Sequence, residues 1–208
     1  MNVPSASSDQ PQRRTRSAHR GRTKARVADP DRVKALLAGR AAAEVSTYHD
    51  TYYDWPDGSL EHEGGQELRV RVIETDDHQR RVLLTFKAAM LDRSSTPEFE
   101  TTVGDASATD AILTGLGLVH LVAFQKHCWN YTFRAHDHDI KATVVQVPEL
   151  AGETFLEVET IVDTPAQTVV ATTAVHNVLT GLGIGDQDLT DELYTDRVRT
   201  QRTTYRQL

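Results

Sequence analysis

The segment Glu67-Leu-Arg-Val-Arg-Val72 reads as a β-strand that carries two arginines one residue apart. Side chains of a strand point alternately to its two faces, so Arg69 and Arg71 share one face, about 7 Å apart, while the apolar residues between them share the other. Guanidinium groups stay charged and bind phosphate oxygens through paired hydrogen bonds. The segment therefore predicts a surface for a ligand with several linked anionic groups, of which a polyphosphate is the natural choice.

Strand signals continue on both sides of this segment. Tyr48 to Asp54 is a predicted strand that runs into the turn Pro56-Asp-Gly58, and Leu84-Thr-Phe-Lys87 is a strand that ends in another cation. The pattern predicts strands near residues 23–27, 44–54, 67–74, 80–87, 97–103, 118–126, 129–135, 140–147 and 154–162.

Three helices interrupt the strands. Asp29-Pro30 supplies an N-cap and a first-turn proline for a helix that ends near Gly39. Asp105 opens a second helix, and Thr164-Pro165 begins a third that runs through Leu179. The phrase Leu-Thr-Gly-Leu-Gly closes both later helices, at 113–117 and at 179–183, which suggests a faint internal duplication. Antiparallel strands crossed by helices make an α+β fold.

Length and composition restrict the class of protein. A chain of 208 residues supports one sizeable core, so we expect a single domain over residues 20–200 after a disordered basic tail at 1–19. No apolar run is long enough to span a membrane and the N-terminus is too polar for a secretory signal, so we expect a cytoplasmic protein. Cys128 is the only cysteine, which excludes an internal disulfide and fits a reduced compartment.

Charge is distributed unevenly along the chain. Residues 1–26 hold seven of the 23 Lys and Arg residues but one of the 30 Asp and Glu residues, so the rest of the chain is strongly acidic. An acidic body disfavours nucleic acid and membrane partners, and bound phosphates must then be met by a local internal patch.

Several segments together resemble the CYTH superfamily, also called the triphosphate tunnel enzymes. The resemblance is carried in order by the segments above, by Pro97-Glu-Phe-Glu-Thr101, by Lys126 and by Phe155-Leu-Glu-Val-Glu-Thr160, and it covers about residues 20 to 195. Asp50-Thr-Tyr-Tyr-Asp54 and the following Pro-Asp-Gly are most similar to class IV adenylate cyclases. The resemblance implies an antiparallel eight-stranded tunnel barrel with crossing helices, a lyase or triphosphatase ancestry and a homodimer.

The resemblance also implies roles for charged residues. It assigns the phosphate to Arg69, Arg71, Lys87 and Lys126, and catalysis to Lys87, Lys126 and Glu157. It assigns divalent metal, Mg²⁺ or Mn²⁺, to two pairs of strand carboxylates, which are Glu98 with Glu100 and Glu157 with Glu159.

Four kinds of active-site position depart from the family pattern, at the first strand and at Thr96, Cys128 and Val145, and the first strand matters most. The family's first strand carries Glu-x-Glu-x-Lys, whose glutamates bind metal, and the best alignment here places Arg20-Gly-Arg-Thr-Lys24 on it. Loss of several metal-binding groups removes several kcal/mol of transition-state stabilisation, so we doubt both the metal and efficient family-type catalysis. Two hypotheses remain open. Arg20, Arg22 and Lys24 enter the tunnel as fixed cations for metal-independent binding, or residues 20–24 are merely tail.

Two other features have a plain structural interpretation. His136-Asp-His-Asp139 alternates potential metal ligands, but it lies where a hairpin turn is expected, and we favour an exposed turn. Cys128 has no activating base at a fixed spacing, and we favour a small buried apolar residue.

The sequence therefore predicts a CYTH-like protein that binds a phosphorylated or otherwise anionic small molecule, as a divergent enzyme turned away from metal-dependent triphosphate chemistry. One alternative is a catalytically silent ligand-binding or regulatory protein. Another is an active adenylate cyclase or triphosphatase that holds metal through its remaining glutamates.

Overall fold

The computed structural model describes residues 19–62, 65–88, 97–150, 152–162 and 164–205. Eight strands form one antiparallel sheet in the order β1-β8-β7-β6-β2-β3-β4-β5. The strands are β1 (His19–Arg26), β2 (Glu44–Asp54), β3 (Glu67–Thr75), β4 (Arg80–Lys87), β5 (Glu98–Val103), β6 (Val119–Ala135), β7 (His138–Gln146) and β8 (Thr154–Val162). The helices are α1 (Pro30–Ala38), α2 (Ser59–His62), α3 (Ala106–Gly115), α4 (Thr168–Gly181) and α5 (Tyr194–Tyr205), with short 3-10 turns at Pro165–Gln167 and Asp186–Asp188.

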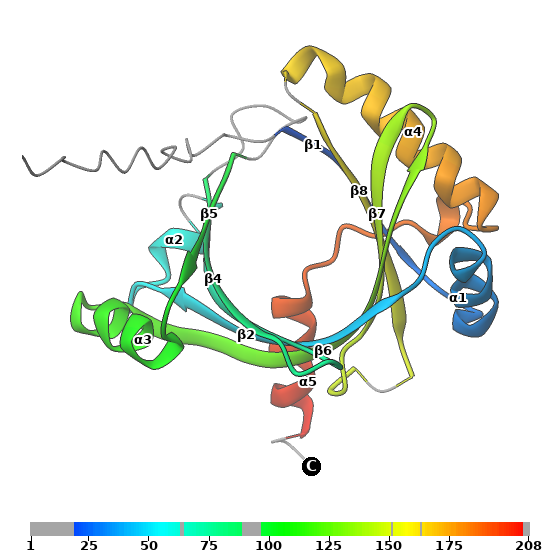
Figure 1. Ribbon diagram of the computed structural model, residues 1–208. Coiled ribbons are helices and arrows are strands. Elements are labelled where there is room, and N and C mark those ends of the chain that lie inside the picture. The colour runs from blue at the N-terminus through cyan, green and yellow to red at the C-terminus, as the bar shows by residue number, and fades with distance from the viewer. Residues whose placement is uncertain (1–18, 63–64, 89–96, 151, 163, 206–208) are drawn as a thin grey trace, which may run out of the picture.

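The sheet curls into an open ring, as Figure 1 shows. Its edges are β1 and β5, and among the described residues these two strands do not pair with each other. Helices α1 and α4 cover the ring on the side of β7 and β8, and α2 and α3 lie outside it on the side of β4. The observed shape is thus a half-barrel, and the backbone ladder leaves the expected tunnel open along one side.

Strand alternation explains how the ring separates an apolar exterior from a charged interior. On β8, Leu156 and Val158 are fully buried and pack with α1 and α4 in one core cluster. The residues between and after them, Glu157 and Glu159, point to the inside of the ring. Gly21 allows α4 to approach β1 closely, because a Cβ there would lie 2.9 Å from the backbone of Ala171.

The predicted fold class is confirmed, but β1 begins at His19 and not at 23, the short helix α2 was not predicted, and three further differences follow. The strands expected at 118–126 and 129–135 are one continuous strand, β6, because no turn-forming residue separates them. The third helix begins at Thr168, after a 3-10 turn that includes Pro165. Helix α5 was not predicted, since its sequence is polar and only Tyr194, Thr195 and Val198 are buried. The predicted basic tail, His19 excepted, lies outside the described residues.

Two helix starts follow the capping chemistry that the sequence predicted. The Asp29 side chain accepts a hydrogen bond from the backbone N–H of Arg32 at the start of α1. The Asp105 side chain does the same for Ala108 at the start of α3. These caps fix where the chain leaves β1 and β5 and turns onto the outer surface of the ring.

Candidate functional site

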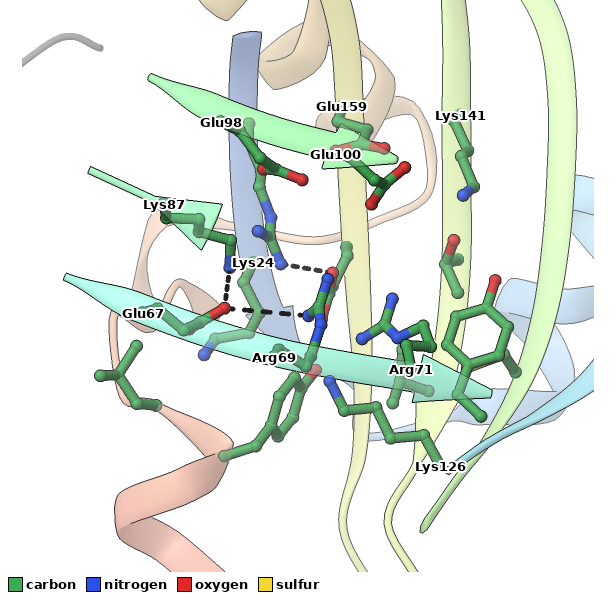
Figure 2. Close-up of a pocket in the computed structure, with 18 of the residues that line it drawn as sticks. Lys24, Glu67, Arg69, Arg71, Lys87, Glu98, Glu100, Lys126, Lys141 and Glu159 are labelled. Carbon is green, nitrogen blue, oxygen red and sulfur yellow. Dashed lines mark hydrogen bonds and ion pairs between the residues drawn. The ribbon is translucent and has the colours of Figure 1, made fainter. Parts of the chain in front are cut away.

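The inside of the ring holds a cavity of about 890 Å³. Figure 2 shows charged side chains reaching into it from strands on all sides. Its cations are Arg22, Lys24, Arg69, Arg71, Arg81, Lys87, Lys126 and Lys141. Its carboxylates are Glu67, Glu98, Glu100, Glu157, Glu159 and Asp191.

Two arginines on β3 and one lysine on β6 meet around a single buried carboxylate. Arg71 donates two hydrogen bonds to Asp50, from Nε at 2.6 Å and from Nη2 at 2.7 Å. Lys126 Nζ lies 3.2 Å from Asp50 Oδ2, the oxygen that also accepts the hydrogen bond from Arg71 Nη2. The Asp50 side chain is fully buried, and the Lys126 side chain is 6% exposed. We call Asp50, Arg69, Arg71 and Lys126 the inner cluster.

Charge and burial oppose each other in the inner cluster. Burial alone would raise the pKa of Asp50, but Arg71, Lys126 and Arg69 outweigh it and hold this pKa well below its usual range. Burial lowers the pKa of Lys126, and the neighbouring Arg71 lowers it further, against the opposing effect of Asp50. A negatively charged ligand would relieve this repulsion among the cations.

Arg69 differs from Arg71 in its remaining hydrogen-bonding capacity. Its Nη2 reaches Thr85 Oγ1 at 3.5 Å, its Nη1 lies 3.9 Å from Glu67, and its buried Nε has no hydrogen-bond partner among the described residues. Glu67 is bound more closely by Lys87 Nζ, at 2.5 Å. Arg69 is therefore a buried cation whose donors are only weakly used.

A second set of charges lies between β1 and β8. Arg22 Nη2 donates to Glu157 Oε2 at 2.5 Å, and these side chains are 40% and 19% exposed. Burial alone would raise the pKa of Glu157, but Arg22 and then Lys126 hold it well below its usual range. Lys24 lies 4.7 Å from the ring centre of Tyr194 and donates to the backbone carbonyl of Glu192. We call Arg22, Lys24 and Glu157 the outer cluster.

The other predicted carboxylates lie on the far side of the cavity. Figure 2 places Glu98 and Glu100 of β5 with Glu159 of β8 across the cavity from Arg69, Arg71 and Lys126. Glu100 accepts a hydrogen bond from Thr85 Oγ1 at 3.0 Å. Within the described residues, no three His, Cys, Asp or Glu side chains gather closely enough to hold a metal ion.

The donor set therefore does not fit the divalent metal that the resemblance implies. Glu157, one of the four expected ligands, already carries the guanidinium of Arg22. A positive charge bound at a carboxylate opposes the arrival of a second one. We derive no reaction step through a metal ion at this site.

The structure brings together most of the residues that the sequence singled out. Seven of the cations and carboxylates with an expected role on the phosphate or in catalysis line one cavity, namely Arg22, Lys24, Arg69, Arg71, Lys87, Lys126 and Glu157. The backbone of Arg20 belongs to β1, but its side chain lies outside the described residues. Residues 22–24 are thus part of the sheet and of the cavity wall.

Two plain structural interpretations agree with the structure. His136 and Asp137 have positive φ angles of 51° and 62° and form the turn between β6 and β7. Cys128 is 1% exposed, and burial raises its pKa to about 12, so the thiolate is disfavoured at neutral pH.

Sequence reasoning gave no role to three residues of the site. Asp50 was part of the quoted tyrosine-rich segment, and its position between Tyr48 and Tyr52 on one strand face was the available signal. Glu67 begins the arginine strand and shares its charged face. Tyr194 gave no signal, because it reaches the cavity from the start of the unpredicted helix α5, where burial and the charge of Glu157 raise its pKa well above the usual range.

Solved structures share this fold at low sequence identity. The PH1819 protein from Pyrococcus horikoshii OT3 is 19% identical, with a TM-score of 0.73 over 88% of this chain and 100% of that chain. A candidate adenylate cyclase from Vibrio parahaemolyticus is 16% identical, with a TM-score of 0.72 over 89% of this chain and 99% of that chain. HpAC1 from Hippeastrum, a candidate adenylyl cyclase described with a dominant triphosphatase activity, is 14% identical, with a TM-score of 0.62 over 88% and 95%.

Two comparisons of the sequence, one with curated proteins and one with protein-family models, complete the assignment of the family. No curated protein matches the sequence. None of the described helices is long and apolar enough to cross a membrane. The family model of the CYTH domain matches residues 23–194, a span that begins within β1, ends at the first residue of α5 and includes all of β2 to β8. The chain therefore belongs to the CYTH domain family.

Proposed function

We propose that the protein binds a small molecule with several linked anionic groups, such as a triphosphate, in the cavity inside the ring. The observation that carries this proposal is the convergence of Arg69, Arg71 and Lys126 on one cavity, with a single carboxylate, Asp50, bonded among them. Three cations around one carboxylate leave an excess of positive charge in a partly dehydrated site. An anion with linked phosphate groups supplies the missing negative charge.

Arg69 and Lys87 supply the directional contacts in this proposal. Arg69 has a guanidinium whose hydrogen bonds are long or absent among the described residues, so a phosphate oxygen can take those donors without displacing a strong partner. Lys87 lines the same cavity and is held by its ion pair with Glu67. Arg71, in contrast, keeps its bidentate bond to Asp50 and contributes mainly its charge.

Catalysis is the second candidate, and one observation favours it. Lys126 is a buried amine whose pKa is lowered by burial and by Arg71, which brings it closer to the range in which an amine transfers protons. Glu157 is the matching carboxylate, but Arg22 neutralises it. We therefore propose binding as the primary function and a divergent CYTH reaction as its extension.

The decisive experiment offers ATP, inorganic triphosphate and thiamine triphosphate to the protein, each with Mg²⁺, Mn²⁺ or EDTA. Calorimetry measures binding, and product analysis detects cyclic nucleotide or released phosphate. The double variant Arg69→Ala/Lys126→Ala is expected to lose at least about a hundredfold in affinity, since two charged contacts disappear. Wild-type protein that binds none of the three ligands would contradict the proposed function, and turnover of any of them would establish the enzymatic extension.

The matched control for this experiment changes exposed charges. The double variant Arg80→Ala/Arg134→Ala removes the same charge from side chains that are 52% and 68% exposed and lie outside the cavity. It is expected to bind like the wild type. A loss of affinity equal to that of the cavity variant would show that net charge, and not the cavity, governs binding.

A further inference from the structure

The two cations of the outer cluster stand opposite two carboxylates, Glu157 and Glu159, across adjacent strands. In the β1–β8 ladder the backbone of Arg22 is paired with Glu159, and that of Lys24 with Glu157. All four side chains line the cavity. The guanidinium of Arg22 donates a hydrogen bond diagonally to Glu157, and the charges of Glu157 and then Glu159 raise the pKa of Arg22, so its side chain stays charged.

A metal cation would favour the place that the Arg22 guanidinium occupies, because the carboxylate of Glu157 is there. A divalent ion binds carboxylate oxygens at about 2.0 to 2.6 Å, with little room for a competing donor on the same oxygen. Glu157 Oε2 already accepts a charged hydrogen bond at 2.5 Å. A dication at this oxygen would have to displace the guanidinium or remain beside it against strong repulsion.

The cationic side chains of the cavity carry enough positive charge to bind a multiply charged anion without a metal ion. Beside Arg69, Arg71, Lys87 and Lys126, the outer cluster adds Arg22 and Lys24. The carboxylates that face these six cations are four, namely Asp50, Glu67, Glu157 and Glu159. The excess is therefore two positive charges on this side of the cavity, which a multiply charged anion can offset.

We propose that Arg22, fixed against Glu157, serves as a built-in cation in place of a divalent metal ion, so that the protein binds a short polyphosphate independently of metal. This inference rests on the proposed function of the same cavity. The ligand class it names is a metal-free polyanion with three or more linked charges. The protein would then prefer the metal-free polyphosphate to its Mg²⁺ complex.

Calorimetric titration of the full-length protein with inorganic triphosphate tests this inference directly. The expected dissociation constant in EDTA equals that in excess Mg²⁺ within about threefold, or is smaller, because Mg²⁺ masks part of the ligand charge. Binding that occurs only with Mg²⁺ would overturn the metal-independent mode and leave the proposed function intact. No binding in either condition would overturn the proposed function and the inference together.

Variants of the ion pair separate a built-in cation from a metal ligand. Arg22→Glu is expected to weaken binding in EDTA at least about tenfold, whereas Arg22→Lys keeps most of the affinity because it keeps the charge. Glu157→Gln is expected to strengthen binding in EDTA, since it removes a negative charge from the cavity. If Glu157 instead held a metal ion, Glu157→Gln would abolish binding in Mg²⁺, and that result would overturn the proposal.

Two controls test whether a loss of affinity comes from unfolding of the variant or from its changed net charge. Arg134→Glu makes the same charge change as Arg22→Glu on the exposed β6–β7 hairpin, and its affinity is expected to match the wild type. Thermal denaturation verifies that each variant is folded, and Arg22→Gln replaces Arg22→Glu if the latter is not. Equal affinity of the wild type and the folded Arg22 variant in EDTA would overturn the role of Arg22.

Discussion

The two charge clusters of the cavity use the same chemistry in different surroundings. In the inner cluster the carboxylate of Asp50 is fully buried and its partner Lys126 is 6% exposed. In the outer cluster Arg22 is 40% exposed and Glu157 is 19% exposed. Water can compete for the outer pair but not for the inner one. The inner cluster is therefore part of the structural framework, whereas the outer cluster contributes less to folding and is accessible to a ligand.

This difference in solvation sets how much each ion pair stabilises the fold. Breaking a buried ion pair by removing one partner leaves an uncompensated charge in a low-dielectric site, which costs about 3–5 kcal/mol. An exposed or half-exposed pair contributes about 0–1 kcal/mol, because water solvates at least one of the two ions without its partner. Stability measurements on the two clusters should therefore diverge, even though both contain an arginine bound to a carboxylate.

The largest effect is expected from Asp50→Ala. This change leaves Arg69, Arg71 and Lys126 buried together without their shared carboxylate, so the free energy of unfolding should fall by about 3–5 kcal/mol. Urea denaturation at neutral pH measures the change. The control Asp139→Ala removes a carboxylate that is 81% exposed on the β6–β7 hairpin and should stay within about 0.5 kcal/mol of the wild type. Equal effects of the two substitutions would abolish the distinction between the clusters.

The inner cluster also shows how far the sequence alone can lead. Alternation along Glu67 to Val72 correctly places Arg69 and Arg71 on one face, because period-two geometry is local. The partner of Arg71 could not be predicted in the same way. Asp50 is 21 residues away, and its contact depends on the register in which β2 pairs with β3, where Asp50 stands opposite Arg71. Register is set by the whole sheet and its packing.

The outer cluster also depends on contacts between distant segments, which the sequence alone could not predict. The sequence left residues 20–24 undecided between wall and tail, because Arg-Gly-Arg-Thr-Lys has no apolar face to predict burial. What places this segment in the sheet is its pairing with β8 and the close packing of α4 against Gly21. Helix α5 escaped prediction for a related reason, since ion pairs such as that between Arg202 and Glu149 anchor it more than an apolar stripe does.

An intermediate effect is expected in the acid range. Folding lowers the pKa values of Asp50 and Glu157, so both carboxylates stabilise the fold at pH values above their unfolded pKa of about 4. This stabilisation is lost as the pH falls from there toward the folded pKa values. Urea denaturation at pH 7 and pH 3 should show that Asp50→Asn and Glu157→Gln each reduce this acid sensitivity, because each removes a carboxylate that the folded protein keeps ionised below its usual pKa. An acid sensitivity left unchanged by both substitutions would mean that neither ion pair holds its carboxylate ionised in the folded protein.

The smallest effect is expected from Arg22→Ala on stability, and it is the sharpest test of the comparison. Its guanidinium is 40% exposed, so water replaces much of what Glu157 provides, and the free energy of unfolding should change by less than about 1 kcal/mol. The same substitution is expected to weaken triphosphate binding in EDTA. A residue that matters for binding but little for folding is what a built-in ligand-binding cation predicts. A stability loss above about 2 kcal/mol would instead place Arg22 in the framework with Arg71, because only a pair that water cannot reach has that much to lose.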